Sequence, residues 1–212
     1  MHDLALQVRE VDCVVVYQGD FSDAGRSEIE RRWRTQAAGA DDQGVRGEDA
    51  ALSLNAEGVE LNQRYASVAI VEEPDAAPEV FERDRELYVQ ATTRPGAKLP
   101  HAWLVNEEHR RVSTLDVTGN GMISLVTGLS GAAWVDAVTK LDKDFLQPVV
   151  IGSPGAQDLY GNWNRVSQMP EGGALLVRPD GFIAWRHSEP VTDPDEAYRL
   201  VKSALTQILG RD

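Results

Sequence analysis

Two short apolar runs near the C-terminus flank a tight turn. Ala174–Val177 and Phe182–Trp185 are the runs, and the segment 178–181 between them reads Arg-Pro-Asp-Gly. Proline fixes φ for the first central position of a turn, aspartate suits the second, and glycine tolerates the positive φ that closes it. The pattern predicts a β-hairpin, and its apolar character predicts that the first strand is covered on both faces.

A helical period follows this hairpin directly. Residues 193–196 read Asp-Pro-Asp-Glu, which supplies an N-cap, a proline at the first helical position and a glutamate three residues after the cap. Apolar residues then recur at helical spacing until Gly210, at Ala197, Val201, Ala204, Leu205 and Ile208. A thioredoxin-like domain ends in this way, and so does any α+β domain that closes with a hairpin and a helix.

The region from residue 101 onward shows a regular alternation of elements. We expect strands at Ala102–Val105, Val112–Val117, Met122–Thr127 and Pro148–Ile151. Turns are expected at 107–110 and 119–121. Helices are expected from Ser130, as the cap, to Leu141 and over Asp158–Gln168. The predicted order is hairpin, β, α, β, α, β, β, α, packed as one sheet with helices on its faces.

The first hundred residues are less regular. We expect a strand at Val11–Tyr17, a polar helix at Ser27–Gln36, a flexible linker at 37–49 and a strand with one wet face at Val59–Tyr65. An acidic loop at 72–78 and a short extended piece at 86–90 follow. We predict a loosely organised segment over 1–50, an extended arm over 51–99 that wraps a neighbouring surface, and a domain over 100–212.

Charge and hydropathy narrow the possible partners. The net charge of −13 argues against nucleic acid and anionic membranes, since both need clustered lysine and arginine. The one basic cluster, Arg31, Arg32 and Arg34, reads as a solvated helix face. No apolar run approaches 18 residues and the N-terminus lacks a signal-peptide pattern. A cytoplasmic location is the default expectation.

The residues that most often carry chemistry are isolated. Cys13 is the only cysteine, so an intrachain disulfide, a CxxC pair and a cysteine-based metal site are excluded; we expect a buried, inert thiol. Neither a Gly-x-Ser-x-Gly elbow nor a calcium-loop spacing around Asp136, Asp142 and Asp144 occurs. The histidines lack metal-ligand spacing and stand at His2, His101, His109 and His187. The tryptophans expected on core faces are Trp103, Trp134, Trp163 and Trp185. We assign no catalytic, cofactor-binding or metal-binding residue.

Four segments, in the same order, resemble one known family. They are Gly58–Tyr65, Thr93–Leu104, Ser113–Asp116 and Leu175–Arg186. They resemble the C-terminal region of FAD-dependent aromatic-ring hydroxylases of the phenol hydroxylase and chlorophenol monooxygenase type. The resemblance covers about residues 51–212.

The resemblance implies an α/β fold, namely a thioredoxin-like domain with a mixed central sheet and flanking helices, preceded by an extended N-terminal arm. In that family the domain has lost its redox cysteines, and Gly128–Ala133 stands here where a thioredoxin would place CxxC. The family binds FAD through a GxGxxG motif in its N-terminal part and draws electrons from NAD(P)H. This chain has no GxGxxG, and Gly19-Asp20 matches a later family motif only as a bare dipeptide.

We therefore interpret the chain as the structural or assembly module of a flavin-dependent phenol-type monooxygenase. It is expected to bind no FAD and to catalyse nothing by itself, although the resembled enzyme uses FAD and NAD(P)H. Its partners would be further copies of itself or the flavin and substrate domains of the parent enzyme. The alternative is a stand-alone binding module that uses the degenerate thioredoxin cleft for a small ligand or a protein partner.

Overall fold

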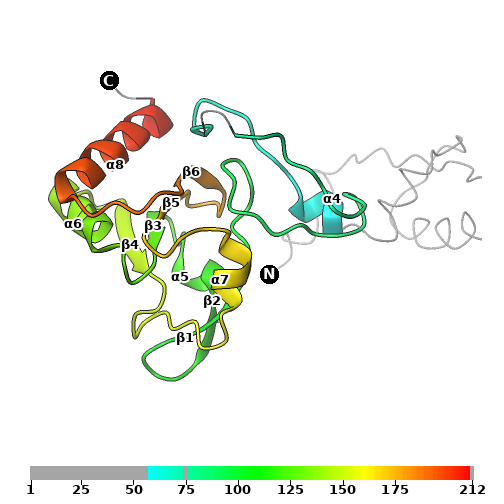
Figure 1. The fold of residues 1–212 in the computed structure, drawn as a ribbon, viewed down its shortest axis with the longest axis horizontal. Coiled ribbons are helices and arrows are strands. Elements are labelled where there is room, and N and C mark those ends of the chain that lie inside the picture. The colour runs from blue at the N-terminus through cyan, green and yellow to red at the C-terminus, as the bar shows by residue number, and fades with distance from the viewer. Residues whose placement is uncertain (1–56, 74–75, 211–212) are drawn as a thin grey trace, which may run out of the picture. The chain divides into compact units, whose positions relative to one another are not determined.

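The computed structural model describes residues 57–73 and 76–210 (Figure 1). Residues 57–60 and 83–88 belong to one compact unit, and residues 61–82 and 89–210 belong to a second, called here the larger unit. The elements predicted at Val11–Tyr17 and Ser27–Gln36, the linker at 37–49 and the expectation for Cys13 lie outside the described residues.

A four-stranded sheet forms the centre of the larger unit, with the order β4-β3-β5-β6 (Figure 1). Strand β3 (Ile123–Thr127) is parallel to β4 (Leu146–Val150) and antiparallel to β5 (Ala174–Val177). Strand β6 (Ile183–His187) pairs antiparallel with β5. Helix α6 (Ala132–Leu141) lies between β3 and β4 in the sequence, and α8 (Pro194–Leu209) follows β6. The prediction of a mixed sheet with flanking helices is confirmed.

The β5–β6 hairpin forms where the two apolar runs predicted it. The Gly181 amide donates to the Arg178 carbonyl over 2.9 Å, and Gly181 has a φ of +81°, which favours glycine. All four residues of β5 are buried, as expected for a strand covered on both faces. The turn chemistry and the apolar runs therefore specify the same structure.

Helix α8 also begins and ends as predicted. The Asp193 carboxylate accepts from the Asp195 amide over 3.0 Å, Pro194 occupies the first helical position, and Gly210 ends the helix with a φ of +59°. The residues predicted to face the core are all buried: Ala197, Val201, Ala204, Leu205 and Ile208.

The strand predicted at Val112–Val117 is only half correct. Strand β2 (Arg111–Ser113) ends at Ser113, and a helical turn, α5 (Thr114–Val117), follows. The Ser113 hydroxyl accepts from the Leu115 amide over 3.0 Å, and the Asp116 carboxylate accepts from the Ser113 amide over 2.7 Å. This capping box starts a helix in place of the strand.

The first hairpin does not join the central sheet. Strand β1 (Trp103–Val105) pairs antiparallel with β2 in a separate two-stranded sheet. The prediction of one sheet was therefore wrong in this respect, while the strand near Ala102–Val105 is confirmed.

Three further predictions need correction. Ser130 does not cap α6, because its hydroxyl donates to Glu171 Oε2 over 2.8 Å, and Gly131 is the N-cap. Helix α4 (Glu57–Leu61) takes the first part of the strand predicted at Val59–Tyr65, and in the remainder Arg64 forms an isolated β-bridge with Ala97. A turn over residues 85–87 includes the first two residues of the piece predicted to be extended, 86–90. The short helix predicted over Asp158–Gln168 is present as α7 (Asn162–Ser167).

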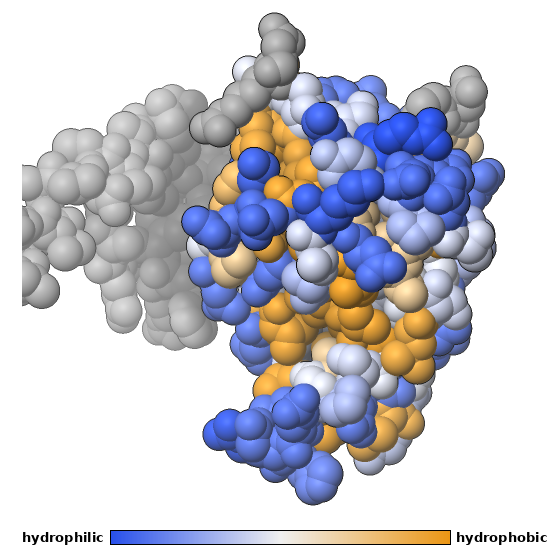
Figure 2. Space-filling model, turned by 90° about the vertical axis from the view of Figure 1, so that its left-hand side faces the viewer, coloured by the Kyte–Doolittle hydropathy of each residue, from blue (hydrophilic) through white to orange (hydrophobic). Residues whose placement is uncertain are grey.

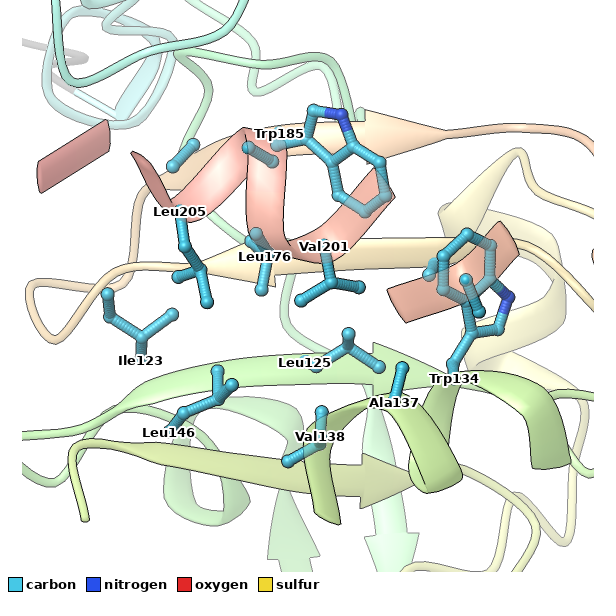
Figure 3. Close-up of a cluster of buried hydrophobic side chains, with 14 of the residues drawn as sticks. Ile123, Leu125, Trp134, Ala137, Val138, Leu146, Leu176, Trp185, Val201 and Leu205 are labelled. Atoms are coloured by element: carbon cyan, nitrogen blue, oxygen red, sulfur yellow. The ribbon is translucent and has the colours of Figure 1, made fainter. Parts of the chain in front are cut away.

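Two hydrophobic clusters cover the two faces of the sheet. Alternate residues of a strand point to opposite faces, so Leu125 and Leu176 face α6 and α8, while Val126 and Leu175 face the other side. Figure 3 shows the first cluster, where side chains from β3, β5, α6 and α8 gather in one layer.

The four tryptophans expected on core faces divide into three environments. Trp134 and Trp185 are buried in the first cluster, and Trp163 is partly buried against the second. Trp103 is 41% exposed, so its placement in the core was wrong. The Arg111 guanidinium lies 4.2 Å from the centre of the Trp103 ring, which stabilises this exposed position by a cation–π contact.

The arm residues of the larger unit are 61–73, 76–82 and 89–99, and two of these segments pair with the outer edge of β6. The Val71 amide donates to the Ala184 carbonyl over 2.7 Å, and the Ile183 amide donates to the Ala97 carbonyl over 2.9 Å. Ile70 belongs to the first hydrophobic cluster and Leu99 to the second. These arm residues therefore lie along the sheet and supply core residues to both of its faces.

Two mostly buried ion pairs stabilise this arm, one between the arm and β6 and one within the arm. The Arg186 guanidinium donates to both carboxylate oxygens of Glu73, over 2.5 and 2.6 Å. Arg64 makes the same bidentate contact with Glu79, over 2.7 Å to each oxygen. The hydrogen bonds from Arg64 hold the pKa of Glu79 below its ordinary value, although burial acts in the opposite direction. Such pairs are costly to break on one side only, because the remaining charge stays buried.

No helix among residues 57–73 and 76–210 has the length and apolar character that a membrane span requires.

The arm's contribution to the core can be tested with two of its own residues. Ile70→Ala is expected to lower the free energy of unfolding by about 2–5 kcal/mol, since it leaves a cavity in the first cluster. Val68→Ala, two residues away and 84% exposed, is the matched control and should change it by less than about 0.5 kcal/mol. Urea unfolding of both variants measures the difference. Equal effects would show that the arm is not part of the core.

Candidate functional site

A pocket of about 650 Å³ opens at the carboxyl ends of β3 and β4. Its apolar floor comes from the sheet and the β4–α7 loop, through Val126, Ile151 and Leu175. Trp163 of α7 and Met169 beyond it line one wall. Ligands of open α/β sheets bind in crevices outside the carboxyl ends of the strands, so this pocket has the position expected of a binding site.

The mouth of the pocket combines apolar and acidic side chains. Leu129 and Leu159 are 60% and 59% exposed there. Asp158 accepts from the amides of Asn162 and Asn164, over 2.8 and 3.2 Å, and so fixes the start of α7. The pocket-lining residues include two carboxylates, Asp158 and Glu171, and no lysine, arginine or histidine. The pocket therefore disfavours anions.

The loop between β3 and α6 forms one side of the pocket and depends on two glycines. The Gly128 amide donates to the Glu171 carbonyl over 3.1 Å, and a Cβ at Gly128 would lie 2.6 Å from Glu171 Cγ. A Cβ at Gly131 would overlap the side chain of Thr127. This is the segment where a thioredoxin would place CxxC, and here the glycines allow close backbone packing instead.

The described histidines occupy three different environments, none of them in the pocket. His101 Nδ1 lies 2.7 Å from the Ser113 hydroxyl. The His187 ring stacks on Trp185, and His109 is exposed in a turn with a φ of +57°. His2 lies outside the described residues. In the part of the chain that the structure describes, no group of three or more histidine, cysteine, aspartate or glutamate residues could hold a metal ion.

Sequence reasoning missed the pocket itself. Trp163 was expected on a core face, and it does contact the second cluster, but it also lines the pocket. Ser167 carried no signal of its own. The available signal was the recurrence of glycine just after two strands, at Gly128 and Gly152, where close backbone approach leaves space at a sheet edge.

Residues 92–212 match a family described as aromatic-ring hydroxylase, C-terminal. A 2,4-dichlorophenol 6-monooxygenase of Delftia acidovorans is 51% identical over 138 residues, which are 62% of this chain and 23% of that protein. A phenol 2-monooxygenase of Pseudomonas sp. (strain EST1001) is 40% identical over 148 residues, which are 68% of this chain and 24% of that protein. The chain thus spans about a quarter of the length of these relatives.

A solved structure is similar to the chain as well. The flavin-dependent monooxygenase PieE, in complex with FAD and substrate, is 39% identical, with a TM-score of 0.66. The likeness covers 91% of this chain and 31% of PieE.

The close packing of the β3–α6 loop leads to a testable expectation. Gly131→Ala should lower the free energy of unfolding by about 1–3 kcal/mol, because the new methyl group overlaps the Thr127 side chain. Gly155→Ala in the β4–α7 loop meets no atom within 4 Å and serves as the matched control. Denaturant unfolding of the two variants checks this. A Gly131 variant as stable as the Gly155 variant would contradict the described loop.

Proposed function

The chain belongs to the aromatic-ring hydroxylase family of the phenol hydroxylase type, through its C-terminal domain, and we propose that it is a structural and assembly module of a flavin-dependent phenol-type monooxygenase. The observation that carries the proposal is the match of residues 92–212 to the C-terminal family. The chain spans about a quarter of the length of each of these relatives, as expected for one domain of a larger enzyme.

We propose FAD and NAD(P)H as the cofactors of the parent enzyme and neither as a ligand of this chain. The cofactor would supply oxygen transfer, and the parent protein would orient it and exclude water. The pyrophosphate of FAD needs backbone amides at a glycine-rich turn and no opposing charge. The pocket presents Asp158 and Glu171 without a lining cation, so its residues do not fit this group.

We further propose that the domain is thioredoxin-like. The order β4-β3-β5-β6, the β5–β6 hairpin and the terminal α8 support this interpretation. We also propose that the chain consists of a loosely organised segment over 1–50, a linking arm over 51–99 and a domain over 100–212. We place the module in the cytoplasm with its parent enzyme.

Association with further copies, or with the flavin and substrate domains, is part of the proposal. Val68 and Val80 of the arm are 84% and 78% exposed, and exposed apolar side chains of this kind favour a covering partner. Figure 2 shows that one face of the molecule carries an apolar area bordered by hydrophilic residues. The net charge of −13 opposes self-association at long range, but physiological salt screens it beyond about 8 Å.

Complementation of a truncated relative tests the assembly role. The Delftia acidovorans relative, shortened by the segment that the chain matches, is mixed with this chain. We expect the chain to purify without flavin, to bind the truncated flavoprotein and to raise its melting temperature. Size-exclusion chromatography, flavin absorbance and thermal unfolding measure these three properties.

The intact Delftia relative is the control, since it already holds its own C-terminal domain and should not bind the chain. A stoichiometric yellow flavin on the isolated chain, or no complex with the truncated relative, would refute the assembly role.

If the chain associates through its arm, substituting exposed apolar residues of the arm should lower the mass of the assembly in solution. The full chain is expected to form a dimer or larger assembly, and the double variant Val68→Ser, Val80→Ser should shift it toward the monomer. Surface variants are preferable to a truncation near Lys98, because truncation would also remove the core residue Ile70. Light scattering at physiological salt gives the mass.

The matched control for this experiment is the double variant Leu115→Ser, Leu209→Ser, whose side chains are 41% and 38% exposed outside the arm. It should associate like the unmodified chain. A monomeric full chain, or an equal shift in both double variants, would exclude the arm as the interface.

A further inference from the structure

We propose that the pocket at the carboxyl ends of β3 and β4 binds an uncharged aromatic small molecule that carries a hydrogen-bonding group. The assembly role makes no use of this pocket. Its volume of about 650 Å³ lies within the range of small-molecule sites, roughly 300–1,000 Å³. The proposal is independent of the assembly role, because it follows from the lining residues alone.

The floor and one wall of the pocket favour a flat apolar ring. Val126, Ile151 and Leu175 are 2%, 5% and 1% exposed, so the floor consists of core side chains. Trp163 presents an indole to the same space, and Met169 adds a polarizable thioether. An aromatic ligand would bury its ring against this surface.

Ser167 supplies the strongest indication of a ligand site. The residue lines the pocket and is 2% exposed. Its carbonyl accepts from the Thr93 hydroxyl, but its own hydroxyl has no hydrogen-bond partner among the described residues. A buried hydroxyl without a partner costs free energy, so native proteins normally satisfy it. A ligand hydroxyl or amide placed over the floor would do so.

A second polar group is available at the mouth. The backbone of Gln157 is engaged with Val105 through two hydrogen bonds of 2.9 Å, while its side-chain amide has no partner in the described part of the chain. This amide can both donate and accept. Together Ser167 and Gln157 provide the small number of polar contacts that fix the orientation of a ligand in an apolar pocket.

The charged side chains that line the pocket favour an uncharged ligand. An anion would meet Asp158 and Glu171 with no lining cation to compensate. Both carboxylates already accept hydrogen bonds, Asp158 from two amides of α7 and Glu171 from Ser130. These hydrogen bonds give the two carboxylates a structural role, so they are poorly placed to bind a cationic ligand. A neutral ring avoids repulsion by the carboxylates and the cost of removing a charge from water.

Two exposed leucines stand at the mouth of the pocket. Leu129 lies over Gly152, where a Cβ would come within 2.8 Å of Leu129 Cγ, and Gly152 has a φ of +102°. Leu129 and Leu159 are exposed apolar side chains that line the pocket, so they can contact a bound ring.

The test compares two probes of equal size on the full chain at pH 7, 2-naphthol and 2-naphthoate. Saturation-transfer NMR is expected to detect 2-naphthol, and titration should show that it binds at least tenfold more tightly than the anion. Amide shifts in ¹⁵N spectra should centre on Gly128, Gly152 and Ser167. No binding of 2-naphthol, equal binding of the anion, or shifts elsewhere would overturn the proposal.

Substitutions in the pocket distinguish an effect on ligand binding from an effect on the stability of the fold. Ser167→Ala should weaken the binding of 2-naphthol by about 2- to 10-fold, which corresponds to the loss of one hydrogen bond. The melting temperature of this variant should stay equal or rise, because an unpaired buried hydroxyl is removed. Trp163→Leu should weaken binding at least as much. Trp103→Leu, at an exposed tryptophan outside the pocket, is the matched control and should bind as the unmodified chain does.

An equal loss of binding in Trp103→Leu, or unchanged binding in Ser167→Ala, would refute the site. If Trp163→Leu does not fold, the amide shifts of the unmodified chain and the Ser167 variant decide. Failure of this experiment would leave the assembly role intact, because that role rests on the family and is read out on a truncated relative.

Discussion

The outer edge of β6 is the constraint on which the larger unit depends. An edge strand leaves a row of amides and carbonyls without partners, and a soluble domain must cover or block such a row. Here the arm does so, with Val71 bonded to Ala184 and Ala97 bonded to Ile183. The Arg186–Glu73 ion pair locks the same contact through side chains. A segment distant in sequence is thereby made part of the domain.

Covering this edge also closes both cores. The same pairing places Ile70 in the first cluster and Leu99 in the second. The arm therefore contributes to the core on both faces of the sheet. With both faces and this edge occupied, the ends of the strands are what remains for a cavity. The pocket lies at the carboxyl ends of β3 and β4, bounded by loops whose glycines permit close approach. Its position is thus a consequence of how the rest of the unit is filled.

The sequence predicts those elements of secondary structure for which several patterns in neighbouring residues indicate the same structure. The β5–β6 hairpin combines apolar runs with turn residues, and α8 combines caps with helical spacing, so both formed as predicted. Family resemblance added the mixed sheet. The errors have two causes. The local Ser113–Asp116 capping box overrode a strand pattern, whereas the Ser130 hydroxyl donates to Glu171, 41 residues away in the sequence, and does not cap its own helix. Glycines after β3 and β4 indicated the place of the pocket, but its lining could not be predicted, because Trp163, Ser167 and Leu175 meet only through long-range packing.

The two edges of the central sheet limit how this module can join other polypeptide. The arm covers β6, and the opposite edge strand, β4, contains Pro148, which has no amide to donate to an added strand. Strand addition is therefore disfavoured at both edges. A partner domain must contact side chains, and the exposed apolar side chains of the arm, such as Val68 and Val80, are suited to that contact. Because these residues lie on the segment that covers β6, a partner that binds the arm would also hold it against the sheet. Association and the stability of the domain are then coupled through the same segment.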